Sequence, residues 1–212
     1  MKQINVKTLL ENMTYYVQEA KNGAVFVYPT DTIYGLWGVV TSSVVDRLDQ
    51  IKQRLPGKHY SIIAPSITRI QKYMHVSDDF AAERDVLKKQ YGPITLLLKP
   101  KLSPLDKGVE LGKASEGGLK NYSLLSSSDL IWVRLIDHPM QELVTALWEP
   151  YITTSANISW QPSISCIDQL SESQYPYIDY IIDDGTLEWS GSTVIVYASG
   201  EIIRSTIIQY TY

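Results

Sequence analysis

The chain has 212 residues, of which 44% are hydrophobic and 20% are charged. This composition is that of an ordinary globular protein and excludes an intrinsically disordered one. No apolar run approaches the roughly 18 residues of a membrane span, and residues 1–7 lack a signal peptide's apolar core, so we expect a cytoplasmic protein without membrane contact. The single cysteine, Cys166, and the three histidines predict neither an internal disulfide nor a metal cluster.

The net charge of −4 is unevenly distributed along the chain. Residues 51–76 contain Lys52, Arg54, Lys58, Arg69 and Lys72 but no acidic residue, whereas residues 135–203 contain ten Asp or Glu and no Lys or Arg. The basic segment indicates an anion-binding site. The acidic half argues against a broad nucleic-acid-binding surface.

Apolar periodicity and turn residues predict alternating helices and strands. The first helix is expected at 8–21, with Gly23 as its left-handed cap. Further helices are expected at 42–54, 66–73, 77–91 and 140–147, with Ser42 or Ser43 and Ser77 as N-caps. Strands are expected at 25–28, 36–40, 61–64, 94–98, 130–136, 151–153, 178–182, 193–197 and 202–204.

This order of elements predicts one α/β domain over residues 1–212. Because some strands are joined by helices and others by hairpins, we expect a twisted sheet of mixed parallel and antiparallel strands flanked by helices. Residues 101–129 are rich in Gly, Ser, Lys and Pro without a period, which predicts a long mobile loop of the kind that often forms a lid.

The apolar residues 25–28 run directly into Pro29-Thr30-Asp31-Thr32, so a buried strand is expected to end at a polar loop. Ligands bind at strand ends in open α/β sheets. Gly35 would allow the backbone to approach a ligand closely. An ordinary strand-to-turn junction would explain the same residues, and this alternative stays open.

Three cations, Lys52, Arg54 and Lys58, lie at the end of a predicted helix and in the loop after it. Cations are favourable at a helix C-terminus, so a charge cap is one interpretation. The other is a polyphosphate site, because Arg holds two oxygens at once and Lys adds a point charge.

A second candidate site comes from the later strands. Arg134 interrupts an apolar strand, where an unpaired guanidinium is prohibitively costly, so it must be paired or face a cavity. No nearby residue in sequence obviously neutralises it, so we expect a ligand's anion to do so, and a permanent acidic partner elsewhere in the chain is the alternative. The hydroxyl-rich run 154–159 and Ser163 follow another strand and would suit phosphate and ribose oxygens, although a simple Ser/Asn-rich turn is the alternative.

Seven motifs together carry a resemblance to a known family. In chain order they are Pro29-Thr-Asp-Thr-Ile-Tyr-Gly-Leu36, Lys52-x-Arg54-x-x-x-Lys58, Gly92-Pro-Ile-Thr-Leu96, Val133-Arg134 with Asp137-His-Pro139, Thr154-Ser-Ala-Asn-x-Ser159, Gly191-Ser-Thr-Val194 and Ile203-Arg204. This set resembles the YrdC-type threonylcarbamoyl-AMP synthases, from about residue 8 to residue 205. The chain is similar to the short form of the family, which consists of the synthase domain alone.

The resemblance implies a YrdC-like fold with an open concave substrate cleft, and a nucleotidyltransferase. The expected reaction forms threonylcarbamoyl-AMP and pyrophosphate from L-threonine, bicarbonate or carbon dioxide, and ATP with Mg²⁺. The product would pass to threonylcarbamoyl-transferase proteins that make t6A at position 37 of tRNA. A contact with tRNA or double-stranded RNA is also implied.

The resemblance assigns residues to each substrate. Lys52 and Arg54 are the expected catalytic cations, acting by charge neutralisation without a covalent nucleophile. ATP would be bound by Lys52, Arg54, Lys58, Thr95, Ser155, Asn157, Ser163 and Arg204. Threonine would be bound by Thr32, Arg134, Thr153 and Ser192. We expect no protein-held metal.

The chain departs from the family pattern at backbone-shaping positions: Tyr91, Ile136, Trp160, Ser205 and Thr206. Trp160 replaces the usual glycine and places a large ring beside the expected ribose and phosphate loop. The departures favour, as an alternative, a non-catalytic or differently specific relative that binds nucleotide or structured RNA. A carbamoyl-transfer domain like those of hydrogenase maturation is a third, weaker interpretation.

Overall fold

The computed structural model describes residues 1–54, 60–101, 129–148, 150–188 and 191–205. The helices are α1 (Val6–Glu11), α2 (Met13–Lys21), α3 (Ser42–Lys52), α4 (Ile67–Tyr73), α5 (Phe80–Tyr91) and α6 (Gln141–Leu147), with short 3-10 turns η3 (Ile167–Gln169) and η4 (Glu172–Tyr177). The strands are β1 (Lys2–Asn5), β2 (Phe26–Tyr28), β3 (Gly35–Gly38), β4 (Ser61–Ile63), β5 (Ile94–Leu98), β6 (Ile131–Arg134), β7 (Tyr151–Ser155), β8 (Tyr180–Asp183), β9 (Thr193–Val196) and β10 (Glu201–Arg204).

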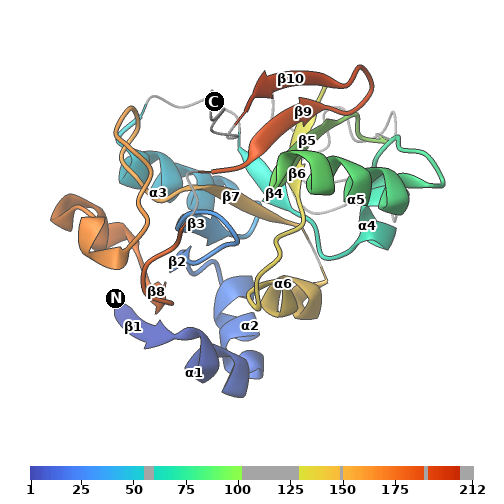
Figure 1. Ribbon diagram of the computed structural model, residues 1–212. Coiled ribbons are helices and arrows are strands. Elements are labelled where there is room, and N and C mark those ends of the chain that lie inside the picture. Colours follow the sequence, from blue (N-terminus) through green and yellow to red (C-terminus); the bar gives the residue numbers. More distant parts are fainter. Residues whose placement is uncertain (55–59, 102–128, 149, 189–190, 206–212) are drawn as a thin grey trace.

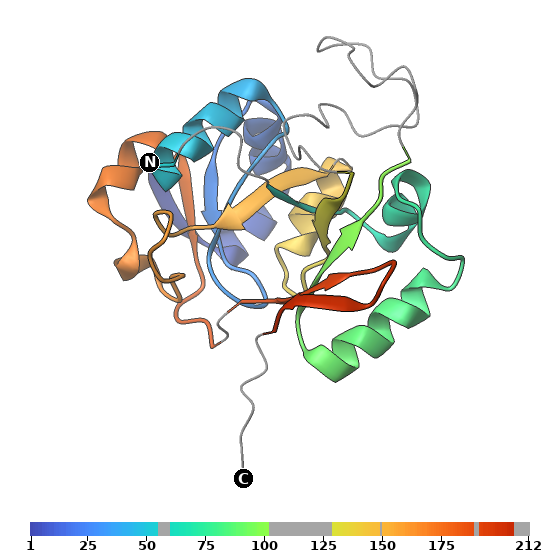
Figure 2. The same cartoon turned by 90° about the horizontal axis from the view of Figure 1, so that it is seen from above.

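Within these residues the strands form one ten-stranded sheet in the order β1-β8-β2-β3-β7-β4-β6-β5-β9-β10 (Figures 1 and 2). The pairs β1/β8, β2/β8, β4/β6 and β5/β9 are parallel. The other neighbours are antiparallel. This confirms the predicted mixed α/β sheet. None of the helices in the described part of the chain is long and apolar enough to cross a membrane.

One face of the sheet is covered along most of its width. Alternate strand residues, such as Leu36, Ile62 and Val133, join a hydrophobic cluster with side chains of α3, α4 and α5. We call this the first cluster. Since successive side chains of a strand point to opposite faces, the residues between them belong to the other face.

The second face is covered only in part. Phe26, Trp37 and Tyr151 pack there against α1, α2 and α6 in a second cluster, and these three helices lie together beside the sheet (Figure 1). Farther along the sheet, the positions on this face are polar or partly exposed. They include Ser61 and Arg134, so the site begins where the helices stop.

The N-terminal region differs from the sequence expectation. A single helix was expected at 8–21, but the structure has β1 and two helices separated at Asn12. Asn5 caps α1 by accepting a hydrogen bond from the Thr8 amide at 2.8 Å. Strand β1 pairs in parallel with β8, far away in sequence. Its residues carry no apolar alternation, so local pattern could not indicate this strand.

Two expected caps were also wrong. Thr41, not Ser42 or Ser43, caps α3, and its hydroxyl accepts from the Val44 amide. Helix α5 begins at Phe80 with Asp79 as its N-cap residue, because Ser77 lies in the turn before it. The loop expected at 101–129 falls almost entirely outside the described residues.

Gly38 offers a test of the packing between β3 and α3. A Cβ atom at Gly38 would lie 2.6 Å from Cγ1 of Val44. Because a β-branched side chain in a helix has one strongly preferred rotamer, Val44 cannot easily move away. We expect Gly38→Ala to lower the free energy of unfolding by about 1–3 kcal/mol, measured by urea denaturation.

The double variant Gly38→Ala with Val44→Ala is the control. If the clash is responsible, the double variant loses less stability than the sum of the two single variants. Additive losses would show that Gly38 is needed for another reason.

Candidate active site

A pocket of about 240 Å³ opens on the uncovered part of the second face; we call it the sheet-face pocket. Its described lining consists of Thr30, Ile33, Gly35, Ser61, Thr95, Trp132, Arg134, Thr153, Thr154, Ser155, Ser163, Gly191, Ser192 and Arg204. Among these residues there are two arginines and no Asp or Glu, and most of the others carry hydroxyls. Such a lining favours an anionic, oxygen-rich ligand.

The loop after β2 is held by the hydroxyl of Thr30. The Thr30 hydroxyl accepts hydrogen bonds from the amides of Thr32 and Ile33 at 3.1 and 3.2 Å and donates to the Ile33 carbonyl at 2.8 Å. Thr32 is fully buried, and its hydroxyl lies 2.9 Å from that of Thr30. The loop is therefore rigid and places Asp31 and Thr32 next to the pocket wall.

Arg134 is paired as well as facing the pocket. Its Nη2 donates to Oδ1 of Asp31 at 2.7 Å, and its Nη1 donates to the Thr32 hydroxyl at 3.1 Å. Only about a tenth of either side chain in the ion pair is exposed. The expectation that Arg134 awaits a ligand as an unpaired cation was therefore wrong, because its partner lies 103 positions earlier in sequence.

Lys52 lies at the end of α3 and is 4% exposed. Its Nζ donates to the Ser155 carbonyl at 2.8 Å, the Ser155 hydroxyl at 3.2 Å and the Asn157 side-chain carbonyl at 3.2 Å. All three acceptors are neutral. Burial, together with the charge of Arg54, lowers the pKa of Lys52 from 10.5 to about 7. The structure thus joins the Lys52 motif to the run 154–159, which the resemblance assigned to the same ligand.

Arg54 has a different position from the one expected of a phosphate clamp. It is not among the pocket-lining residues; its Nε donates to Asp49 at 2.8 Å, and its guanidinium stacks 4.2 Å from the centre of the Tyr60 ring. Tyr60 also donates to Asp49 at 2.7 Å. Arg54 is therefore held by Asp49 and Tyr60, and its charge contributes to the lowered pKa of Lys52. Lys58 lies outside the described residues.

Thr95, Ser192 and Arg204 form the opposite wall. The hydroxyls of Thr95 and Ser192 are 2.6 Å apart, and Arg204 donates from Nε and Nη2 to the Ser192 carbonyl at 3.2 and 3.0 Å. Burial, and next the charge of Arg134, lowers the pKa of Arg204. Two guanidinium groups therefore share one pocket with a single carboxylate partner, Asp31, identified among the described residues.

Most of the expected site residues meet at this pocket. Its lining includes Thr95, Thr153, Ser155, Ser163, Ser192, Arg134 and Arg204. Thr32 and Asn157 lie directly behind it, through their hydrogen bonds to Arg134 and Lys52. The sequence interpretation did not assign Ser61 or Trp132 to the site. Trp132 could have been identified by strand alternation, because it is two residues before Arg134, but Ser61 could not, because its pairing with Trp132 is set by the order of the strands in the sheet.

The departures from the family pattern are accommodated by the surrounding structure. Trp160 has a left-handed backbone with φ of 70°, which favours glycine, and its side chain is 90% exposed and outside the pocket lining. Ile136 is buried in the second cluster, and Tyr91 packs against the first. Ser205 follows β10, and Thr206 lies outside the described residues.

The comparisons with known proteins agree with this geometry. The sequence model of the Sua5/YciO/YrdC family, described as "Telomere recombination", matches residues 18–206. The chain therefore belongs to this family. It is 28% identical over 203 residues to a putative threonylcarbamoyl-AMP synthase of Methanocaldococcus jannaschii, covering 95% of this chain and 87% of the relative.

Other relatives are longer. The human threonylcarbamoyl-AMP synthase is 28% identical over 173 residues, which is 81% of this chain but 55% of the human protein. Among solved structures, P. abyssi Sua5 complexed with L-threonine has a TM-score of 0.68 at 24% identity, with 90% of this chain and 52% of Sua5 covered. E. coli YciO has a TM-score of 0.71 at 21% identity, with coverages of 93% and 90%. These structures confirm the YrdC-like fold.

The pair formed by Asp31 and Arg134 is expected to stabilise the folded protein. Arg134→Met would leave the Asp31 carboxylate buried without a counter-charge, so we expect the free energy of unfolding to fall by about 3 kcal/mol, the lower end for a broken buried pair. Chemical denaturation at pH 7 measures this loss. The double variant Asp31→Asn with Arg134→Met should recover much of it. An Arg134→Met protein as stable as the wild type would contradict the structural importance of the pair.

Proposed function

We propose that the protein is a threonylcarbamoyl-AMP synthase, a nucleotidyltransferase that converts L-threonine, bicarbonate or CO₂, and ATP into threonylcarbamoyl-AMP and pyrophosphate. The observation that carries the proposal is the sheet-face pocket, where Arg134 and Arg204 face a hydroxyl-rich wall and Lys52 lies behind Ser155. Membership of a family whose relatives bear this name supports it.

The proposed binding mode divides the pocket between the two substrates. Arg134, Thr153 and Ser192 hold threonine, whose carboxylate pairs with the Arg134 guanidinium, and the buried Thr32 acts from behind by orienting Arg134. Ser155, Ser163, Thr95 and Arg204 hold ATP, supported by Lys52 and Asn157. Both sets of residues border the same small volume, so the threonine carbamate and the α-phosphorus are brought into contact.

The proposed chemistry relies on position and charge. The threonine amine first adds to CO₂ and loses a proton, which gives the carbamate; where bicarbonate is the source, water is released. A carbamate oxygen then attacks the α-phosphorus, the new oxygen–phosphorus bond forms, and the bond from the α-phosphorus to pyrophosphate breaks. Lys52 and the arginines stabilise the negative charge that develops on the phosphate oxygens. Of the two expected catalytic cations, Lys52 is the one that adjoins the pocket, through its hydrogen bonds to the lining residue Ser155, whereas Arg54 is engaged with Asp49.

We further propose that ATP arrives with Mg²⁺. The described pocket lining has hydroxyls but no carboxylate, and the described residues contain no group of three or more His, Cys, Asp or Glu that could hold a metal. These residues fit an ion held mainly by phosphate oxygens and water. The ion would neutralise charge on the leaving pyrophosphate.

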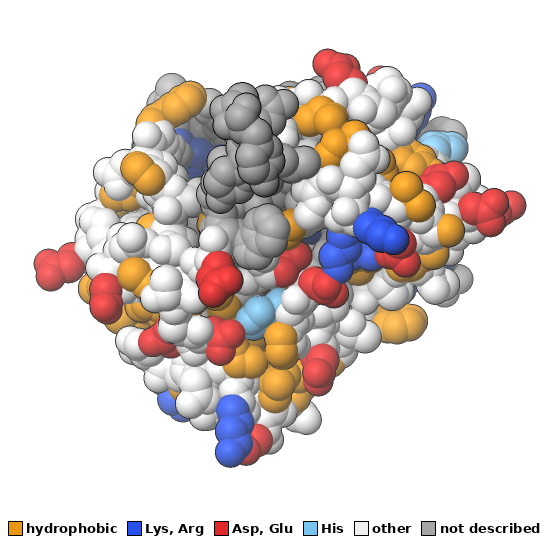
Figure 3. All heavy atoms as spheres, in the orientation of Figure 1, with side chains coloured by type: hydrophobic (Ala, Val, Ile, Leu, Met, Phe, Trp, Pro, Cys, Tyr) orange, Lys and Arg blue, Asp and Glu red, His pale blue; other side chains and the backbone are white. Residues whose placement is uncertain are grey.

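The proposed setting is the cytoplasm, where the product would pass to the threonylcarbamoyl-transferase proteins of the t6A pathway. A direct contact with tRNA or double-stranded RNA is part of the same proposal. On the face shown in Figure 3, basic and acidic side chains of the described residues are interspersed and form no continuous basic surface. Any RNA contact on this face would therefore be local.

Product formation tests the activity. Incubation of the protein with labelled bicarbonate, threonine, ATP and Mg²⁺ should give labelled threonylcarbamoyl-AMP and an equal amount of pyrophosphate. Thr32→Ala removes the hydrogen bond that orients the Arg134 guanidinium, so it should raise the KM for threonine about tenfold and leave the KM for ATP unchanged. Thr68→Ala, at an exposed position of α4, is the matched control. Nucleotide binding without labelled product would instead identify a non-catalytic relative.

The low pKa of Lys52 predicts pH-dependent ATP binding. The free protein loses the Lys52 proton as the pH rises through about 7, whereas bound phosphates favour the charged amine and raise its pKa. ATP affinity should therefore fall between pH 7 and pH 9, by up to about tenfold per pH unit, with proton uptake on binding. Calorimetry in buffers of different ionisation enthalpy measures both effects. In Lys52→Met the affinity should be lower and this pH dependence absent; an unchanged pH profile would show that Lys52 does not meet the phosphates.

A further inference from the structure

Trp132 is the aromatic residue in the described lining of a pocket otherwise formed by hydroxyls, glycines, arginines and Ile33. It is partly buried, and it lies on β6 two residues before Arg134. Its neighbours Ile131 and Val133 belong to the first cluster on the opposite face. Strand alternation therefore directs the indole of Trp132 to the same side as the Arg134 guanidinium.

The pairing register places Trp132 in a row of residues that crosses the open face. Thr153 on β7 is opposite Ser61 on β4, Ser61 is opposite Trp132 on β6, and Trp132 is opposite Leu97 on β5. Neighbouring strands are about 4.8 Å apart, so Trp132 lies about 10 Å from the phosphate-binding strand β7. Leu97 is buried, at 8% exposed, and is not part of the described pocket lining, so the row ends at Trp132 on the side of β5.

This row matches the parts of a nucleotide. Phosphates need cations and small donors, which β7 and α3 supply at Ser155 and Lys52. A ribose needs hydroxyl partners, and Ser61 lies between β7 and β6. A base is planar and largely apolar on its faces, and an aromatic side chain is the surface on which any base can stack.

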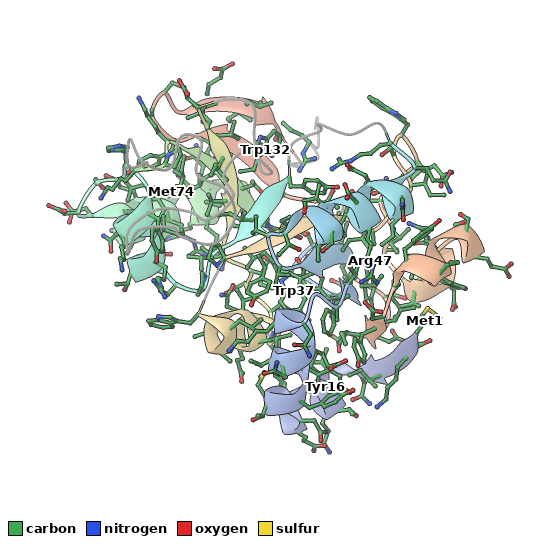
Figure 4. All side chains as sticks on the ribbon, turned by 180° about the vertical axis from the view of Figure 1, so that it is seen from behind. Met1, Tyr16, Trp37, Arg47, Met74 and Trp132 are labelled. Carbon is green, nitrogen blue, oxygen red and sulfur yellow. The ribbon has the colours of Figure 1, made fainter. Side chains whose placement is uncertain are left out.

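We propose that Trp132 is the stacking platform for the nucleotide base and that Ser61 faces the ribose. This inference rests on the proposed use of ATP and specifies how ATP lies in the pocket. Figure 4 shows Trp132 beside β4 and β6, apart from Trp37, which lies near α2. Trp160, whose ring was expected beside the ribose and phosphate loop, is 90% exposed and outside the pocket lining.

If Trp132 stacks on the base, it contributes to the binding of the base and not to that of the phosphates. Calorimetry with two probes, ATP and inorganic tripolyphosphate, tests this. Trp132→Leu should weaken ATP binding roughly 5- to 100-fold, the range for loss of one stacked base. Binding of inorganic tripolyphosphate, which has no base, should change less than twofold in the same variant. Trp132→Phe retains a ring and should bind ATP within a few-fold of the wild type. Trp160→Leu is the matched control and should bind both probes as the wild type does.

Tryptophan fluorescence gives a second readout that does not depend on the leucine variant folding. ATP should quench the wild-type emission, and Trp132→Phe should lose most of this quenching while it still binds ATP. The inference is overturned if Trp132→Leu binds ATP normally, if it loses ATP and tripolyphosphate equally, or if Trp132→Phe keeps the full quenching. A wild-type protein that binds tripolyphosphate but shows no preference for ATP over it also overturns the inference. Failure of the wild type to bind ATP at all would instead overturn the proposed function on which the inference rests.

Discussion

The structure depends on the two-residue alternation of a sheet that has a full core on one face and a partial core on the other. Residues such as Ile62, Val133 and Ile152 fill the first cluster on the covered face. Their immediate neighbours Ser61, Arg134 and Thr153 consequently face the side where α1, α2 and α6 do not reach. A shift of one residue in register would bury these polar groups and expose the core, so the same packing that stabilises the fold also fixes the site.

The site concentrates positive charge in a partly desolvated place, which is unfavourable without compensation. Asp31 compensates Arg134, and neutral oxygens of Ser155 and Asn157 surround Lys52. Burial lowers the pKa of Lys52, and burial also lowers the pKa of Arg204. A polyanionic ligand would supply the missing negative charge and so relieve the unfavourable electrostatic energy of the free site. The site therefore favours polyanionic ligands.

The comparison with relatives separates what is shared from what is particular to this chain. The fold is shared with YciO over 90% of its length and with the corresponding part of Sua5. The same fold occurs in HypF, at 21% identity and over 28% of that longer chain, so the fold by itself does not select an activity. Local features carry the distinction. In this chain Trp132 is part of the pocket lining, where a large ring changes both the shape and the ligand preference of a polar cavity, whereas the ring of Trp160 lies outside it.

The sequence by itself determined the mixed α/β class, most of the strands, and the residue types that meet at the pocket, because apolar alternation and ordered motifs are local properties of the chain. Only the tertiary structure decided that Asp31 neutralises Arg134, that Arg54 is paired with Asp49 and stacked on Tyr60, and that β1 joins β8. The pairs Asp31–Arg134 and β1–β8 join residues more than a hundred positions apart, and the orientation of Arg54 depends on the packing around α3. The sequence indicates which side chains are charged or apolar, but their partners follow from how the strands are ordered in space.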